Sequence, residues 1–234
     1  MPEAVFLGSK ILVFTAHPDD ESYLAAGTIY ENTRRGGKTF LVCATGGELG
    51  SAHLKKPISP RALKLLRKRE FFSAAEYLGA QTPKMLNFPD GRLHGKGTGL
   101  YRQCLATAEN IAPDCILSFG QDGITGHMDH IEIGRAAKKI AKRLRVPFYA
   151  FALPPRFAKD ALERLKYRRK KGTYTKGGVE YEKPNVFVKI SRQIKLRALR
   201  FHASQMEGNK LFTGYPDYAV KALLNREYFV KMKT

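Results

Sequence analysis

Short apolar segments alternate with amphipathic segments along most of this chain, and this alternation is the feature that most restricts its fold. The apolar segments are typical of buried strands and cover 11–16, 38–44, 85–88, 115–119 and 147–153. Apolar stripes with helical spacing lie between them, at 21–35, 61–78, 100–111 and 133–144. Strands joined in this way by helices form a parallel sheet with helices on both faces. The sequence therefore predicts an α/β, Rossmann-like, doubly wound fold.

The C-terminal third follows this pattern less closely. The segment 154–184 is basic and rich in Gly and Tyr, and we interpret it as a variable insertion within a single domain that spans 1–234. No linker composition marks a second domain. The elements expected after the insertion are a strand at 186–190, a helix from Ser191, which suits an N-cap, to about Gln205, and a helix at 218–224.

The net charge is the unusual feature of the composition. Lys and Arg number 41 against 21 acids, which gives a formal charge of +20. This excess implies attraction to an anionic partner such as a nucleic acid, a phosphorylated substrate or an acidic membrane surface. The basic runs 55–69, 135–145 and 156–176 mostly coincide with helices, where solvated faces are the simpler interpretation. Aromatic residues are dispersed and no nucleic-acid-binding motif is present, which argues against a nucleic acid partner.

Targeting signals and cysteines add further expectations. No apolar run reaches the length of about 18 residues needed for a membrane helix, and no signal-peptide pattern precedes the first strand. We therefore expect a cytoplasmic protein without a membrane segment, and leave a homo-oligomer open. Cys43, Cys104 and Cys115 lie in apolar contexts without CxxC spacing, so we expect buried, reduced thiols.

The first strand ends abruptly in a polar cluster, His17-Pro18-Asp19-Asp20-Glu21. Three carboxylates crowded together repel one another, and a divalent cation would offset this repulsion. His17 and Asp20 are three residues apart and can both reach one ion as the chain turns into a helix. The alternative is an ordinary helix start, in which Asp19 or Asp20 caps free amides and Glu21 favours the helix dipole.

A second cluster, His127-Met128-Asp129-His130, follows the fourth strand. In a sheet of order 3-2-1-4-5, the first and fourth strands are neighbours, and ligands bind in the crevice at their carboxyl ends. His17, Asp20 and His130 would then provide two imidazoles and one carboxylate. Such a ligand set leaves open positions for water and substrate, as in catalytic metal sites.

The remaining histidines differ in their surroundings. His127, with Asp129 nearby, could meet a developing oxyanion, and its alternative is a loop histidine bonded to the backbone. His53, His94 and His202 have no comparable cluster of acids and histidines near them in the sequence. We expect His53 and His94 in surface loops.

Together these motifs resemble the LmbE-like, or PIG-L, family of zinc-dependent N-acetylsugar de-N-acetylases. The two histidine motifs are specific, and several others support them in combination. The supporting motifs are Thr45-Gly46-Gly47-Glu48-Leu49-Gly50, Arg67-x-x-Glu70, Pro89-Asp90-Gly91 and Lys195-x-x-Ala198-x-x-x-His202-x-Ser204-Gln205. The segment 154–184 and the tail show no match.

The resemblance implies a hydrolase that removes the acetyl group from an N-acetylglucosamine-type sugar or conjugate by attack of a zinc-bound water. It implies zinc ligation by His17, Asp20 and His130, although Fe²⁺ or Co²⁺ also suits these ligands. It further implies Asp19 as the general base and His127, oriented by Asp129, as the group that stabilises the oxyanion. Whether Asp19 or His127 returns the proton to the amine is left open.

By the same resemblance, Arg67 and Asp90 would contact sugar hydroxyls, and Glu48 would lie near the site. Their structural alternatives are a helix-surface charge, a turn former and a loop cap, respectively. The cations of 154–184 and the tail favour an anionic N-acetylated conjugate over a neutral glycoside. Two other classes of function remain as alternatives: a two-His-one-carboxylate iron enzyme, although such sites usually lie in antiparallel barrels, and a basic nucleic-acid-binding protein.

Overall fold

A mixed sheet of seven strands forms the centre of the computed structural model, which describes residues 6–50, 54, 56–154, 182–206 and 217–232. Within these residues the strand order is β3-β2-β1-β4-β5-β7-β6. The strands are β1 Lys10–Thr15, β2 Lys38–Thr45, β3 Lys84–Phe88, β4 Cys115–Phe119, β5 Phe148–Ala152, β6 Val186–Lys189 and β7 Arg226–Met232. The first five strands are parallel, and β7 is antiparallel to both β5 and β6. The predicted α/β class and the order 3-2-1-4-5 are confirmed.

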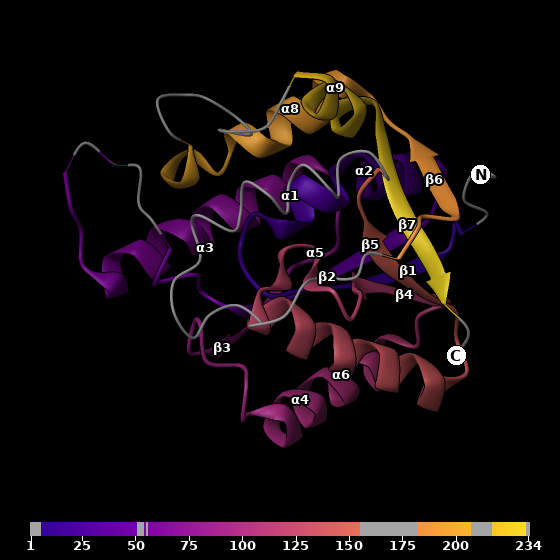
Figure 1. Ribbon diagram of the computed structural model, residues 1–234, viewed down its shortest axis with the longest axis horizontal. Coiled ribbons are helices and arrows are strands. Elements are labelled where there is room, and N and C mark those ends of the chain that lie inside the picture. Colours follow the sequence, from indigo (N-terminus) through magenta and orange to yellow (C-terminus); the bar gives the residue numbers. More distant parts are fainter. Residues whose placement is uncertain (1–5, 51–53, 55, 155–181, 207–216, 233–234) are drawn as a thin grey trace.

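Helices cover both faces of the sheet (Figure 1). One face carries α1 Asp20–Leu24, α2 Ala26–Arg34, α3 Pro60–Tyr77, α8 Arg192–Arg200 and α9 Asp217–Asn225. The other face carries α4 Gly97–Ile111 and α6 Met128–Leu144, and α6 packs on β1, β4 and β5. The short α5 Gly123–Gly126 and the 3₁₀ turn η1 Ala203–Gln205 lie at loop ends. Two covered faces explain why the central strands are apolar along their length.

Burial in the core agrees with this arrangement. β4 and β5 are buried at every position, and β1 at every position after its first residue. All three cysteines are buried and free, as predicted. Among the described helices, none has the length and apolar character needed to span a bilayer.

The helix expected at 21–35 is in fact two helices separated at Ala25, whose φ of −144° is not helical. The break at Ala25 leaves the first N–H groups of α2 without partners inside the helix. The carboxylate of Glu227 on β7 accepts hydrogen bonds from them. The N–H groups of Gly27 and Thr28 donate to Glu227 at 3.0 and 2.8 Å. Lys195 of α8 donates to the same carboxylate at 2.9 Å. A distant acid thus replaces the local N-cap, which no pattern within 21–35 could reveal.

The C-terminal third differs most from the expectations. The strand at 186–190 and the helix at 218–224 are confirmed as β6 and α9, but β7 follows α9 directly and was not predicted. The Ser191 hydroxyl caps α8 as expected, by accepting the N–H of Ile194 at 3.5 Å. That helix ends at Arg200, before the expected Gln205. The insertion lies mostly outside the described residues, and the single domain stays a prediction.

Removal of one partner of the ion pair between Lys195 and Glu227 should be strongly destabilising, because both side chains are almost fully buried. Glu227→Ala would leave the ammonium group without a counter-charge and two helix amides without an acceptor. We expect the free energy of unfolding to fall by about 3–5 kcal/mol in urea denaturation. Arg143→Ala, which removes an exposed ion pair with Glu109, should change it by about 0.5 kcal/mol or less. A loss below about 1 kcal/mol for Glu227→Ala would contradict this expectation.

Candidate metal and catalytic site

The two polar clusters meet at the carboxyl ends of β1 and β4, as the strand order predicted. Nδ1 of His17 lies 3.2 Å from Nε2 of His130. Oδ2 of Asp20 lies 3.8 Å from that Nδ1, and Oδ1 of Asp20 lies 3.5 Å from that Nε2. A tetrahedral zinc ion with bonds of about 2.0–2.1 Å separates its ligand atoms by roughly 3.4 Å. The distances from Nε2 of His130 to Nδ1 of His17 and to Oδ1 of Asp20 therefore suit one ion.

Hydrogen bonds also fix the tautomer of each histidine. Nδ1 of His130 lies 2.9 Å from the carbonyl oxygen of Gly123, which can only accept, so this nitrogen carries the proton. Nε2 of His17 lies 3.1 Å from Asp90 and 3.4 Å from Asp129, so it donates to carboxylates. When both rings are neutral, the lone pairs are left on Nε2 of His130 and Nδ1 of His17, the two atoms that face each other. This outer arrangement is typical of metal-ligating histidines.

Two further groupings around His17 bring ligand-type atoms within 4.8 Å of one another: His17 with His127 and His130, and His17 with Asp90 and Asp129. The carboxylates around His17 differ in how many of their oxygens already accept main-chain N–H groups. Asp129 accepts two main-chain N–H groups of the loop after β3, at 2.7 and 3.0 Å, and Asp90 accepts the N–H of Leu49 at 2.8 Å. Both oxygens of Asp129 are thus occupied, whereas main-chain N–H groups reach only Oδ2 of Asp20, which favours the set that contains Asp20 as the candidate metal site.

The pKa shifts of the site histidines indicate an excess of negative charge. Burial alone would lower the pKa of His17, but hydrogen bonds to Asp129 and Asp90 and the charge of Asp20 raise it to about 10. Burial and the nearby charge of His17 lower the pKa of His130 to about 3. A site that draws a proton onto a buried imidazole holds excess negative charge, which a divalent ion would offset in the proton's place. The residues therefore fit a divalent metal.

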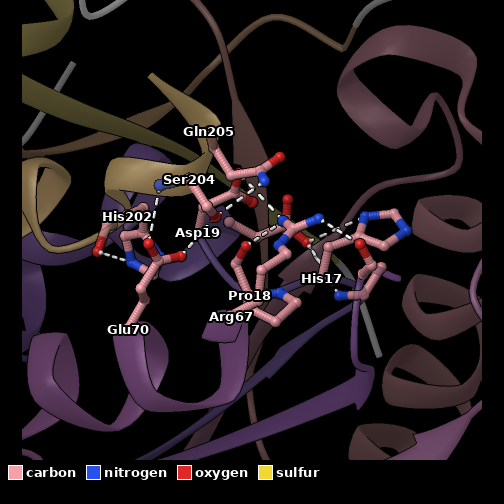
Figure 2. Close-up of polar contacts among 12 residues, drawn as sticks. His17, Pro18, Asp19, Arg67, Glu70, His202, Ser204 and Gln205 are labelled. Carbon is pink, nitrogen blue, oxygen red and sulfur yellow. Dashed lines mark hydrogen bonds and ion pairs between the residues drawn. The ribbon is translucent and has the colours of Figure 1, made fainter. Parts of the chain in front are cut away.

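Each of the three consecutive acids has a different partner. Figure 2 shows Asp19 beside Arg67. An oxygen of Asp19 lies 3.3 Å from the guanidinium of Arg67. One oxygen of Asp20 accepts two main-chain N–H groups at the end of β1, at 3.0 and 2.8 Å. Glu21 lies 2.7 Å from Nε2 of His202. The acids are therefore held apart by separate partners.

The backbone at Asp19 separates the acids further. Its φ of 115° lies on the left-handed side, where a non-glycine residue costs about 1–3 kcal/mol and which is typical of functional sites. Asp19 is the N-cap residue of α1, but its side chain caps no amide. The alternative of an ordinary helix cap therefore does not account for this carboxylate. Burial raises its pKa to about 6, although the charge of Arg67 lowers it.

The guanidinium of Arg67 is buried and bonded within the chain. It donates to the carbonyl oxygens of Gly47 at 2.8 Å and of Pro18 at 2.5 Å, in addition to its contact with Asp19. A side chain on Gly47, which has a φ of 66°, would place its Cβ 2.2 Å from Arg67. Glycine at position 47 is therefore needed to leave room for the guanidinium. Because Arg67 is buried, a helix-surface role is excluded.

The other predicted site residues lie in the same region. Glu48 accepts the N–H of Asp90 at 3.1 Å, and its second oxygen has no hydrogen-bond partner within the described residues. The main-chain N–H of Asp129 donates to Nδ1 of His127 at 3.2 Å. Asp129 thus orients His127 through its backbone, while its carboxylate contacts His17. All nine predicted site residues belong to this connected region.

His202 also belongs to this region, although no predicted site residue lies near it in the sequence. It is 1% exposed and contacts both Glu21 and Ser22. The motif that ends in Ser204-Gln205 was the one indication in the sequence that His202 belongs to the site. Its acidic partner, Glu21, is 181 residues away in the chain. His94 is exposed, as expected, and His53 lies outside the described residues.

Comparisons with known proteins agree with the fold and the motifs. Residues 12–141 match the family model described as PIG-L, GlcNAc-PI de-N-acetylase. The probable N-acetyl-alpha-D-glucosaminyl L-malate deacetylase 2 of Bacillus anthracis is 31% identical over 203 residues, which are 83% of this chain and 80% of that protein.

Solved structures are similar over most of the chain. The N,N'-diacetylchitobiose deacetylase from Pyrococcus horikoshii has a TM-score of 0.67 at 23% identity, and covers 97% of this chain and 85% of its own. GalB, the 4-carboxy-2-hydroxymuconate hydratase from Pseudomonas putida, has a TM-score of 0.62 at 22% identity, with coverages of 84% and 80%. At these identities the likeness shows the fold alone.

We expect the protein purified from metal-replete medium to hold about one divalent ion per chain, because three donors from two strand ends are already arranged. His130→Ala should lose the ion by elemental analysis and calorimetric titration. His94→Ala, which removes an exposed histidine, should retain it. Equal metal content in the two variants would contradict this ligand set.

Proposed function

Because this chain belongs to the PIG-L family of de-N-acetylases, we propose that it removes the acetyl group from an N-acetylglucosamine-type sugar conjugate in a metal-dependent hydrolysis. One observation supports the proposal most strongly. His17, His130 and Asp20 lie together at the carboxyl ends of β1 and β4, and Asp19 is adjacent to Asp20 in the sequence. Amide hydrolysis requires a polarised carbonyl and a group that takes a proton from water. This arrangement suits both needs.

We propose that His17, Asp20 and His130 hold the ion, and that zinc is the resident metal. Once bound, a divalent ion supplies a Lewis acid and lowers the pKa of a coordinated water from roughly 16 to about 7. Two imidazoles and a carboxylate are a common catalytic zinc set. Fe²⁺ and Co²⁺ suit the same donors, so the choice of zinc rests on the resemblance of the motifs.

Asp19 is the proposed general base. Its pKa of about 6, raised by burial and opposed by Arg67, leaves the carboxylate ionised at neutral pH yet able to accept a proton. Arg67 is bonded to Asp19 and to two carbonyl groups of the chain. We therefore assign Arg67 to orienting the base rather than to contacting a sugar hydroxyl.

His127 is the proposed donor to the oxyanion. Its Nδ1 accepts the N–H of Asp129, so a neutral ring carries its proton on Nε2. A fixed N–H donor stabilises negative charge on the acetamide oxygen as the tetrahedral intermediate forms. With His127 in this role, Asp19 is left to return the proton to the departing amine.

Other residues would contribute around the sugar. Asp90, bonded to His17 and to the N–H of Leu49, is assigned to orienting the metal ligand. The resemblance of the motifs puts Glu48 near the sugar; one of its oxygens accepts the N–H of Asp90, and the other is buried without a hydrogen-bond partner in the described region. An anionic conjugate is supported by the chain's charge of +20 and by the malate in the name of the Bacillus anthracis relative.

The role of Asp19 can be separated from that of Asp20 by isosteric replacement. Asp19→Asn removes the proton acceptor and should lower kcat by at least about a hundredfold while metal content is unchanged. Asp20→Asn removes a charged ligand and should weaken metal binding itself. If Asp19→Asn released the metal and Asp20→Asn kept it, the two assignments would be reversed.

The proposed function is tested by acetate release from a panel of N-acetylated sugars, neutral and anionic. We expect release from N-acetylglucosamine conjugates, with kcat/KM for the malate conjugate about tenfold above that for chitobiose at low salt, a difference that high salt should reduce. Absence of release from every sugar in the panel would refute the deacetylase assignment. Equal efficiency for neutral and anionic sugars at low salt would refute only the preference for anions.

A further inference from the structure

Glu21 is the acid of the first cluster that the proposed mechanism does not use. Its side chain is fully buried. One oxygen accepts the main-chain N–H of Asp19 at 3.0 Å. The other accepts the hydroxyl of Ser22 at 2.6 Å and lies 2.7 Å from Nε2 of His202. A single carboxylate therefore connects the backbone of the proposed base to the segment that follows α8.

Asp19 needs such a restraint, because its φ of 115° and ψ of −26° are unfavourable for a residue with a side chain. Glycine would adopt this backbone more easily but would provide no carboxylate. Relaxation toward negative φ would turn the Asp19 side chain away from its present direction relative to Asp20. The bond from the Asp19 N–H to Glu21 opposes this relaxation.

His202 is itself held from helix α3. The carboxylate of Glu70 accepts the N–H of Ser204 at 2.8 Å and its hydroxyl at 2.7 Å, which fixes the turn after His202. Glu70 lies one turn after Arg67 on α3, and Arg67 contacts the Asp19 carboxylate. Figure 2 shows these side chains grouped around Asp19. The same helix thus supports the base directly and, through the 202–204 turn, indirectly.

We propose that Glu21 and His202 are positioning residues, which hold the backbone of Asp19 so that its carboxylate is aimed at the attacking water. The proposal rests on the function proposed above. It predicts a loss in the chemical step, with little change in substrate binding or metal content, because neither residue belongs to the proposed metal ligands or sugar contacts.

The test compares two replacements of His202. The side-chain nitrogen of Gln can occupy the position of Nε2 and donate to Glu21. The side chain of Asn is too short for its nitrogen to reach this position. We expect His202→Asn to lower kcat at least tenfold, with KM and metal content unchanged, and His202→Gln to recover much of this loss. Ser191→Ala, which removes the N-cap of α8 away from the site, is the control for destabilisation of the same helix.

A second measurement does not depend on activity. In the metal-free protein, exchange of the Asp19 amide hydrogen followed by NMR should accelerate in His202→Asn and in the milder Ser22→Ala, but not in Ser191→Ala. If His202→Asn fails to fold, Ser22→Ala decides. Should no acetate be released by the wild type, the proposed function fails, and the exchange data still report on the backbone restraint.

Two results would overturn the proposal. One is a loss of kcat in His202→Asn that does not exceed the loss in Ser191→Ala at equal folded fraction, or that His202→Gln shares fully. The other is unchanged exchange of the Asp19 amide in Ser22→Ala. Either would reduce the buried pair to a role in stability alone.

Discussion

The mutual repulsion of Asp19, Asp20 and Glu21 is the constraint on which the site depends. They lie next to one another at the end of a buried strand, where burial of unpaired carboxylates is costly. The fold resolves this by giving each acid a partner from a different element: Arg67 of α3, the histidines that follow β1 and β4, and His202 after α8. The left-handed backbone at Asp19 makes this divergence geometrically possible.

The sequence was sufficient for the parts of this arrangement that depend on local pattern. Strands and helices could be predicted from periodicity, and the strand order from the rules for parallel sheets. Because both histidine motifs directly follow strands, their meeting at one edge was also predictable. The pairing of His17 with His130 and Asp20 needed no further information.

The features that were missed depend on contacts between distant residues. The break at Ala25 is stabilised by Glu227, and the burial of His202 by Glu21, and neither partner is near in sequence. Strand β7 begins at the residue after α9, so no loop separates the two elements in the sequence. Arg67 had a helix-surface alternative because its spacing on α3 does not reveal that Gly47 and Gly50 leave room for its guanidinium.

The position of the bound ion tests the account most directly, and X-ray anomalous scattering at the zinc absorption edge would locate it. The account predicts one peak bonded to Nδ1 of His17, Nε2 of His130 and a carboxylate oxygen of Asp20, with Asp19 outside bonding distance. A peak on the opposite edge of the His17 ring, bonded to Nε2 and to the carboxylates of Asp90 and Asp129, would contradict it.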